Sequence, residues 1–228
     1  MQINSHWPPL CKFARGKPSC FDAPIEAAAQ RLVTAAREVD EIVVVGHSGG
    51  GALAPAVVAR ALELDPDVGR RAAAVVLLMV GSIAPGAALH PKAEWLRAVF
   101  ARLAIEPSIA WIEVQARKDA LAFWNFDPVE GVGVHPGSGR RNPILWPVRF
   151  RDMLSDEVYA KIRVNLFWMH YQFIMANDRR APYDYYMLLC GPVPATTWAE
   201  SPHAVLAAFA ADASLAEDRV AAPVAGSS

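Results

Sequence analysis

The sequence predicts an α/β protein with a mostly parallel sheet flanked by helices. Short, continuous apolar segments of strand length alternate with longer segments whose apolar residues recur at helical spacing. Of the 228 residues, 54% are hydrophobic and 20% are charged, which is enough apolar material for one sizeable core. Strands that are apolar on both faces favour parallel pairing between two layers of helices.

The first elements alternate between helix and strand. Asp22 can begin a helix whose apolar residues share one face, namely Ile25, Ala29, Leu32 and Ala36. The segment EIVVVG at 41–46 is a short apolar run typical of a buried parallel strand. A second helix is expected from about Gly50 to Leu64. We expect a kink at Pro55, because proline cannot donate to the carbonyl four residues earlier.

The same alternation continues through the middle of the chain. Strands are expected at 73–82 (AAVVLLMVGS) and at 109–116 (IAWIEVQA). Between them, 90–104 has helical spacing, and Pro91 near its start suits the first turn of a helix. A loop rich in glycine and proline is expected over about Asp127 to Trp146.

The last third is expected to add two strands and three helices, one of which directly follows His170. Ser155 is a suitable helix start. The stretch 162–168 alternates mostly as a strand does and runs into His170, and 185–192 (YYMLLCGP) is a candidate last strand. Pro202 opens a helix to about Leu215. We therefore divide the chain into an irregular N-terminal segment (1–21), one α/β domain (22–216) and a flexible tail (217–228).

Charge and cysteine content exclude several classes of protein. The formal net charge is −1, so no global field favours nucleic acid or an anionic membrane. The uncharged run 72–89 is interrupted by glycine and proline, which favours a buried strand and a loop over a membrane span. Cys11, Cys20 and Cys190 have no metal-like spacing. We expect a reduced, cytoplasmic setting.

Residues 46–50, GHSGG, match the pattern G-x-S-x-G where a predicted strand meets a predicted helix. Such a turn strains its central residue and needs small neighbours, which Gly46, Gly49, Gly50 and Gly51 provide. The Ser48 hydroxyl would then project from the carboxyl edge of the sheet, and the Gly49 N–H would face a developing oxyanion. A phosphate-binding turn and a tight turn with an incidental serine are the alternatives.

The segment VVVGHSGGG at 43–51 resembles the nucleophile elbow of the α/β-hydrolase superfamily. The resemblance covers about residues 23–200, is specific at the elbow, and looks most like bacterial serine hydrolases with lipase-like or esterase-like elbows. It implies an α/β-hydrolase-like fold, no metal or organic cofactor, and triad residues in the order serine, acid, histidine.

Three histidines follow the candidate acids in the sequence. The resemblance places the base at His170, which ends a predicted strand and precedes a helix. His203 is an alternative near a helix N-terminus, where the helix dipole disfavours imidazolium. His135, in the GVGVHPGSG loop, is a further alternative. His47, inside the elbow, is expected to point elsewhere.

The candidate acids are Asp119 and Asp127, which both follow the predicted strand 109–116. Asp127 is favoured, because its WNFDPV surroundings could shield a contact with histidine and Pro128 stiffens the loop. Asp119 lies closer to the strand end and is the alternative. Asp152 is a third candidate, better explained as a charge flanking a helix.

The elbow comes earlier in this chain than in full members of the family, where several strands precede it. The predicted elbow strand begins at Ile42, and the first twenty residues contain no convincing strand. We therefore expect an N-terminally truncated fold, from a fragment or a mis-assigned start, with an open apolar edge at 42–45. Coverage of that edge by the N-terminal coil or a partner chain is the alternative. Gly49 is the one oxyanion donor that we assign.

The sequence thus predicts a serine hydrolase that cleaves an ester or related acyl bond of a small molecule. Ser48 would attack, His170 would transfer the proton, and Asp127 would orient His170. Aromatic residues near the proposed acid and base suggest an apolar acyl group: Trp124, Phe126, Phe167 and Trp168. The alternatives are acyl transfer and a catalytically impaired domain that binds a partner, or a second copy of itself, through the sheet edge.

Overall fold

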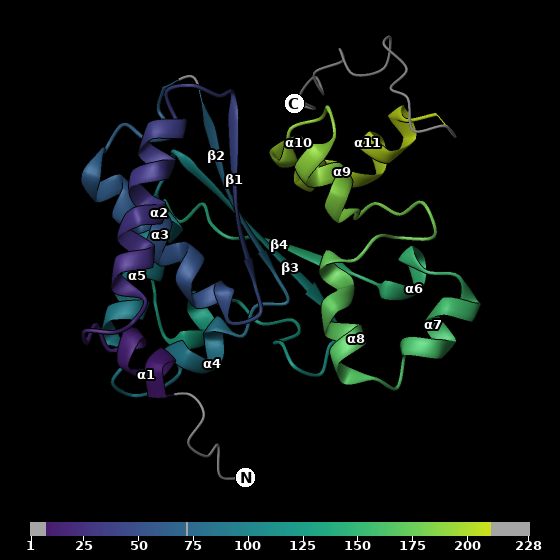
Figure 1. The fold of residues 1–228 in the computed structure, drawn as a ribbon, viewed down its shortest axis with the longest axis horizontal. Helices are drawn as coiled ribbons and strands as arrows, with labels where there is room; N and C mark the ends of the chain where they lie inside the picture. The colour runs from purple at the N-terminus through teal and green to yellow at the C-terminus, as the bar shows by residue number, and fades with distance from the viewer. Residues whose placement is uncertain (1–7, 72, 211–228) are drawn as a thin grey trace.

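The computed structural model describes residues 8–71 and 73–210 (Figure 1). It contains one parallel sheet of four strands in the order β1-β2-β3-β4. The strands are Glu41–His47 (β1), Ala74–Val80 (β2), Ile109–Ala116 (β3) and Ile144–Val148 (β4). The predicted α/β class with a parallel sheet is therefore confirmed, and the three predicted strands in the first half of the chain are present.

The register brings the carboxyl ends of the strands to one edge of the sheet. Val44 pairs with Leu77, and Leu77 pairs with Trp111. In the described part of the chain, β1 has a neighbouring strand only on its β2 side. Its residues from Glu41 to Val45 are half-buried, whereas almost all of β2 is buried. Side chains that follow the ends of β1, β2 and β3 can therefore meet at the same edge.

One face of the sheet is covered by the helices of the first half of the chain (Figure 1). These helices are α1 (Pro8–Ala14), α2 (Asp22–Ala35), α3 (Gly50–Leu64), α4 (Ala84–Ala88) and α5 (Glu94–Ile105). Leu77 and Trp111 lie in the core on this face. The helices predicted from Asp22 and from Gly50 to Leu64 are confirmed, and the helix predicted at 90–104 begins at Glu94.

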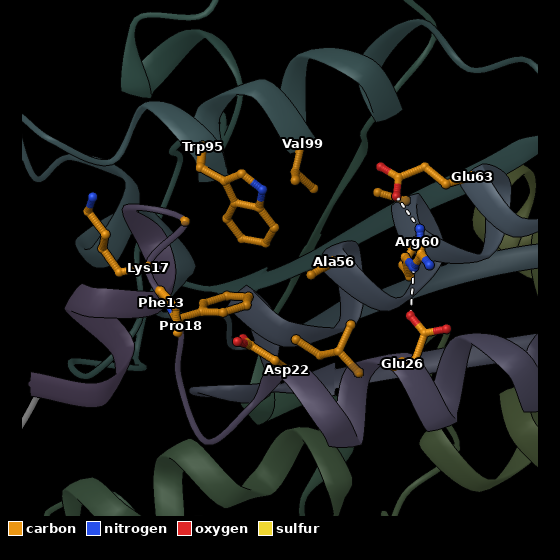
Figure 2. Close-up of a pocket in the computed structure, with 13 residues that line it drawn as sticks. Phe13, Lys17, Pro18, Asp22, Glu26, Ala56, Arg60, Glu63, Trp95 and Val99 are labelled. Carbon is orange, nitrogen blue, oxygen red and sulfur yellow. Dashed lines mark hydrogen bonds and ion pairs between the residues drawn. The ribbon is translucent and has the colours of Figure 1, made fainter.

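The segment 1–21 is not irregular throughout as predicted, because α1 lies within it. This helix buries Leu10 and Phe13, and the Phe13 ring meets Trp95 edge-on at 4.8 Å between centroids. A cavity of about 340 Å³ lies beside this contact, among α1, α2, α3 and α5 (Figure 2). At its other end Arg60 bridges Glu26 and Glu63, at 2.7 and 2.9 Å.

The opposite face is covered by the helices of the second half (Figure 1). They are α6 (Phe150–Met153), α7 (Asp156–Ile162), α8 (Leu166–Tyr171), α9 (Tyr185–Cys190), α10 (Ala195–Glu200) and α11 (Pro202–Ala208). The described residues also contain three short 3₁₀ turns, at Glu130–Val132 (η1), Gly137–Gly139 (η2) and Gln172–Ile174 (η3). Val76 and Val114 point into the core on this face and pack with Phe173 and Trp198.

Two predicted strands in the second half are helices. The stretch 162–168 is divided between α7 and α8, and Asn165 Oδ1 begins α8 by accepting the Trp168 N–H at 3.1 Å. The segment 185–192 contains α9, which Asp184 caps by accepting from the N–H groups of residues 186 and 187. These caps satisfy the free N–H groups of a helix start, so they override the strand-like alternation.

The fourth strand and the last helix also differ from the prediction. The end of the predicted loop Asp127–Trp146 forms the first half of β4, which lies at the edge of the sheet and tolerates Pro147. The helix from Pro202 ends at Ala208, not near residue 215. The predicted tail 217–228 lies outside the described residues.

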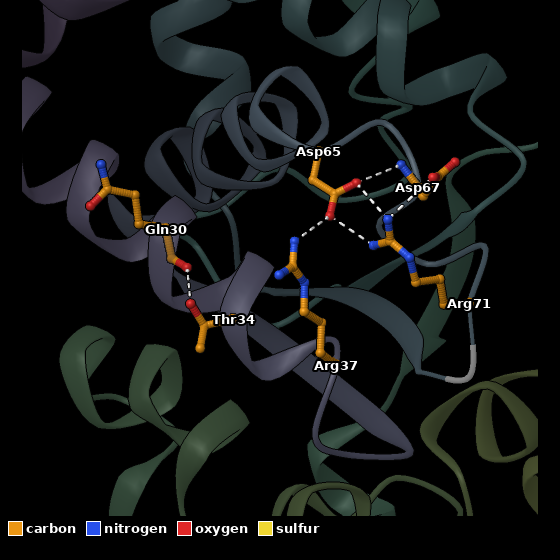
Figure 3. Close-up of polar contacts among 6 residues, drawn as sticks. All are labelled: Gln30, Thr34, Arg37, Asp65, Asp67 and Arg71. Atoms are coloured by element: carbon orange, nitrogen blue, oxygen red, sulfur yellow. Dashed lines mark hydrogen bonds and ion pairs between the residues drawn. The ribbon is translucent and has the colours of Figure 1, made fainter.

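A buried carboxylate fixes the connection after α3 (Figure 3). Asp65 is 8% exposed and accepts hydrogen bonds from Arg71 at 2.7 and 3.1 Å and from Arg37 at 3.4 Å. The Asp67 N–H donates to the same carboxylate at 3.1 Å. Hydrogen bonding to Arg71 lowers the pKa of Asp65 to about 2, so this group is ionised at neutral pH.

Within the described ranges, no helix has the length and apolar character needed to cross a bilayer. Within the uncharged run, residues 74–80 form β2 and residues 84–88 form α4, and most residues of both elements are buried.

Candidate active site

Ser48 lies in a strained turn between β1 and α3. Its φ angle is +55°, in the left-handed region that non-glycine residues rarely adopt. The Ser48 carbonyl accepts the N–H groups of Gly51 at 3.0 Å and Ile83 at 3.2 Å, which fixes this conformation. The strained strand-to-helix turn predicted from G-x-S-x-G is therefore present.

The glycines around Ser48 do not all serve the same purpose. A Cβ on Gly46 would lie 2.9 Å from the Gly50 carbonyl oxygen, and a Cβ on Gly51 would lie 2.2 Å from Ser82 Oγ. At Gly49 and Gly50, a Cβ would meet nothing within 4 Å. The expectation that all four must be small for packing is wrong for these last two. The turn is tightly packed at Gly46 and Gly51 and open at Gly49 and Gly50.

Two backbone N–H groups lie at the start of α3 beside Ser48. The N–H groups of Gly49 and Gly50 have no backbone acceptor among the described residues, as expected at a helix N-terminus. A helix of 15 residues also places partial positive charge there. The predicted oxyanion donor, the Gly49 N–H, is thus free to bind an anionic oxygen.

The base expected from the sequence is paired with a buried carboxylate. His170 Nδ1 lies 2.8 Å from Asp119 Oδ2, and each residue is only 3% exposed. Asp119 follows the end of β3, and His170 lies in α8, so the contact joins the sheet edge to the second helical layer. The other oxygen of Asp119 accepts the Leu121 N–H at 3.0 Å, which fixes the carboxylate.

This pairing determines the tautomer of His170. With Nδ1–H donated to Asp119, the neutral imidazole carries its lone pair on Nε2. His170 Nε2 is buried and has no hydrogen-bond partner in the described part of the chain. A buried ring nitrogen backed by a carboxylate meets part of what a general base requires, and no hydrogen bond joins it to Ser48 Oγ in the described part of the chain.

His47 connects the base to the elbow, which the sequence reasoning missed. Its Nε2–H donates to the His170 carbonyl at 3.2 Å, and the two rings lie 4.7 Å apart. Burial lowers the pKa of His47, which keeps this ring neutral at pH 7. The expectation that His47 points away from the base is therefore wrong. Its position directly before Ser48 was the available signal.

Gly81, at the end of β2, allows the site to close around Asp119. Its φ is +54°, and a Cβ there would lie 2.7 Å from the Phe173 ring and 3.2 Å from Asp119 Oδ2. Any larger residue would push Phe173 or the carboxylate out of position. The sequence reasoning treated this glycine only as an interruption of an apolar run.

Asp127, the favoured acid, is not the partner of His170. It accepts hydrogen bonds from Arg140, from the Val129 N–H at 2.8 Å and from the Glu130 N–H at 3.0 Å. Gln115 binds the backbone of the preceding residue, Phe126, through both its side-chain oxygen and nitrogen. Because this part of the loop packs with the α3 and α5 layer, Asp127 is kept on the opposite face from His170.

The remaining candidates lie outside the pair. His135 and His203 are exposed, and neither contacts Asp119. Asp152 lies in α6, 3.6 Å from Arg149, as expected of a charge that flanks a helix. The four aromatic residues expected near the site are partly accessible: Trp124, Phe167 and Trp168 are 39%, 69% and 52% exposed, and Phe126 is half-buried against Phe123.

Comparison of the chain with models of protein families, with curated proteins and with solved structures found no match. The chemistry of this site therefore has to be argued from its own geometry. Among the described residues, no group of three histidine, cysteine, aspartate or glutamate side chains is placed to bind a metal ion.

Proposed function

We propose that the protein is a serine hydrolase of the α/β-hydrolase type that cleaves an ester or related acyl bond of a small molecule. The observation that carries the proposal is the buried Asp119–His170 pair with a free Nε2. It lies at the carboxyl edge of the sheet, where β1 ends in the strained turn at Ser48. Asp119 replaces Asp127 as the acid.

Each residue has a defined part in the reaction. Ser48 Oγ attacks the carbonyl carbon while His170 Nε2 accepts its proton, and Asp119 stabilises the resulting imidazolium. The Gly49 N–H donates to the oxyanion of the tetrahedral intermediate. His170 then protonates the leaving alcohol, and a water molecule activated by His170 hydrolyses the acyl-enzyme.

Two further observations support this assignment. Ser48, Asp119 and His170 occur in the chain order of α/β-hydrolases, which differs from the orders found in chymotrypsin and subtilisin. In addition, a Cβ on Gly49 or Gly50 would meet no atom within 4 Å, so no neighbouring side chain or backbone fills the space directly beside these two residues. The base and nucleophile are expected to form their hydrogen bond when substrate is bound, as is common for catalytic pairs.

Hydrolysis of 4-nitrophenyl esters tests the proposal. Ser48→Ala is expected to abolish turnover while leaving the circular dichroism spectrum unchanged, since the small side chain removes only the nucleophile. Unchanged turnover in this variant would refute the mechanism. Addition of alcohols or amines as acceptors distinguishes hydrolysis from acyl transfer by the products formed.

The edge of β1 that pairs with no described strand favours a second candidate function, self-association through strand pairing. β1 has a described strand on one side only, and its apolar residues 42–45 are half-buried. Unpaired apolar edges are templates for a further strand. Sedimentation velocity over a range of protein concentrations tests this function, and association is expected to persist in Ser48→Ala.

A further inference from the structure

A second cavity, of about 550 Å³, opens at the carboxyl ends of β3 and β4. Ala116 and Val148, the last residues of these two strands, form part of its wall. In open α/β sheets, ligands bind outside the carboxyl ends of the strands. The volume lies within the range of small-molecule sites. This cavity is therefore placed and sized to accept part of a substrate.

The wall of this cavity is strongly basic. It contains Arg117 and Lys118 after β3 and Arg149 and Arg151 after β4, and it contains no acidic residue. Arg149 is 3.6 Å from Asp152, and the other three cations form no ion pair with a described residue. Because the whole chain has a net charge of −1, this concentration of positive charge is local. Gathered like charges repel, and an anion bound among them relieves that repulsion.

Aromatic side chains accompany the cations. The Arg151 guanidinium lies over the Tyr159 ring, 5.2 Å from its centroid, which limits the directions in which its N–H groups point. Trp124 also lines the cavity and is 39% exposed. The site thus offers oriented donors for an anionic group and an apolar surface next to them.

Residues of the cavity wall are neighbours of the proposed active-site residues, both in the sequence and in the packing. Lys118 immediately precedes Asp119, and Phe150 of the cavity wall packs against Phe173 at 5.0 Å between ring centroids. Phe173 in turn lies beside Gly81, next to the carboxylate of Asp119. The same edge of the sheet therefore carries both the Asp119–His170 pair and the basic cavity.

We propose that the basic cavity binds an anionic group of the substrate, so that the substrate is an ester bearing a carboxylate or phosphate away from the scissile carbonyl. This inference rests on the proposed function. The cavity among the helices in Figure 2 is less suited to recognise such a group, because the positive charge of Arg60 is already paired with the carboxylates of Glu26 and Glu63.

Binding is measured first, without turnover. The full chain carrying Ser48→Ala is titrated by calorimetry with phenyl phosphate, benzoate and the neutral benzamide. We expect saturable binding of one or both anions and none of benzamide. Adding Arg117→Gln and Arg151→Gln should weaken anion binding about tenfold or more, because hydrogen bonds to charged groups are lost. The matched control Arg31→Gln removes an exposed charge from α2 and should change nothing.

The two anions show which anionic group the cavity prefers. Tighter binding of phenyl phosphate indicates a phosphate group on the substrate, and tighter binding of benzoate indicates a carboxylate. Equal binding of benzamide, or anion binding that Arg117→Gln and Arg151→Gln leave unchanged, would overturn the inference. Lys118→Gln and Arg149→Gln, tested singly, provide the same test if the double variant does not fold.

Kinetics then separate this inference from the proposed function. The mono-4-nitrophenyl esters of succinic, adipic and suberic acid are compared with their methyl-capped neutral counterparts. We expect kcat/KM to be about tenfold higher for a charged ester than for its neutral counterpart. In the arginine variants, the two esters should have equal kcat/KM. Hydrolysis without preference for charge would reject the cavity and retain the hydrolase. Anion binding without any hydrolysis would retain the cavity as an anion site and reject the hydrolase.

Discussion

His170 Nδ1 and Asp119 Oδ2 lie 2.8 Å apart in a contact that buries both side chains almost completely. Fifty-one positions separate the two residues in the chain, so the pair exists only because β3 and α8 converge at one edge of the sheet. A histidine that donates its Nδ1–H to a carboxylate has a fixed tautomer and a fixed ring orientation. The pair thereby makes His170 the candidate base among the histidines that the structure describes.

Asp119→Asn should lower kcat for ester hydrolysis about 10⁴-fold, because the amide favours the wrong tautomer of His170. KM should change little, since Asp119 acts through His170 and does not bind the substrate. The matched control is Asp127→Asn, in the same loop and paired with Arg140, which should retain most of the activity. An equal loss in both variants would show that Asp119 has no special relation to the base.

Glu113 should make the protein less stable as the pH rises through neutrality. It is buried in β3 with one hydrogen bond, from Trp111 Nε1 at 3.1 Å, and burial raises its pKa to about 8. The folded chain therefore binds a proton that the unfolded chain releases above its usual pKa of 4.5. The stability gained from this bound proton is fully present below about pH 4. It decreases as the pH rises and is gone by about pH 8.

Urea unfolding at several pH values measures this effect with Glu113→Gln as the comparison. Between pH 4 and pH 7 the free energy of unfolding of the wild-type chain should fall by about 3 kcal/mol more than that of the variant, because the pKa of Glu113 is raised. The amide keeps an acceptor for Trp111 and has no proton to release in this range. The same pH dependence in both chains would contradict the assignment.

Asp65 should show the opposite dependence on pH. Arg71 lowers its pKa to about 2, so the stability that this carboxylate confers is present above its unfolded value of 3.8 and is lost as the pH falls toward 2. Asp65→Asn should lower the urea midpoint at pH 7 but not near pH 2. Asp67→Asn is the control, because Asp67 is 65% exposed and makes a single ion pair at 3.2 Å. A midpoint difference that persists at pH 2 would argue against this role.

The two kinds of glycine around Ser48 should respond differently to alanine. Gly51→Ala places a Cβ 2.2 Å from Ser82 Oγ and should destabilise the chain by about 1–3 kcal/mol through overpacking. Gly49→Ala meets nothing within 4 Å and should leave the unfolding midpoint nearly unchanged. Thermal unfolding of the two variants makes the comparison. Equal destabilisation would mean that the turn is not packed as described.

Much of the first half of the fold could be predicted, because its signals are local. The apolar run of β1, the glycines and the helical spacing of α3 lie within about 25 consecutive residues, and they also predicted the strained Ser48. The ends of such elements were harder to place. The helix predicted from His90 begins at Glu94, after residues 90–93 form a turn.

The second half could not be predicted as well, because its structure depends on distant contacts. β4 is positioned by Asn142, whose side chain accepts the Trp111 N–H at 3.0 Å and donates to the Leu103 carbonyl at 2.9 Å. The alternation before His170 suggested a strand, but Phe167 and Trp168 remain exposed on α8. The choice between Asp119 and Asp127 depended on how Gln115 directs the loop, and nothing local indicates that path.

The central claim, that His170 and Asp119 activate Ser48, is tested most directly by labelling the full chain with a fluorophosphonate probe and mapping the modified peptide. We predict covalent label on Ser48 that is lost in His170→Gln, strongly slowed in Asp119→Asn and retained in Asp127→Asn. Absence of label on the folded wild-type chain, or labelling of Ser48 at the same rate in His170→Gln, would contradict the account.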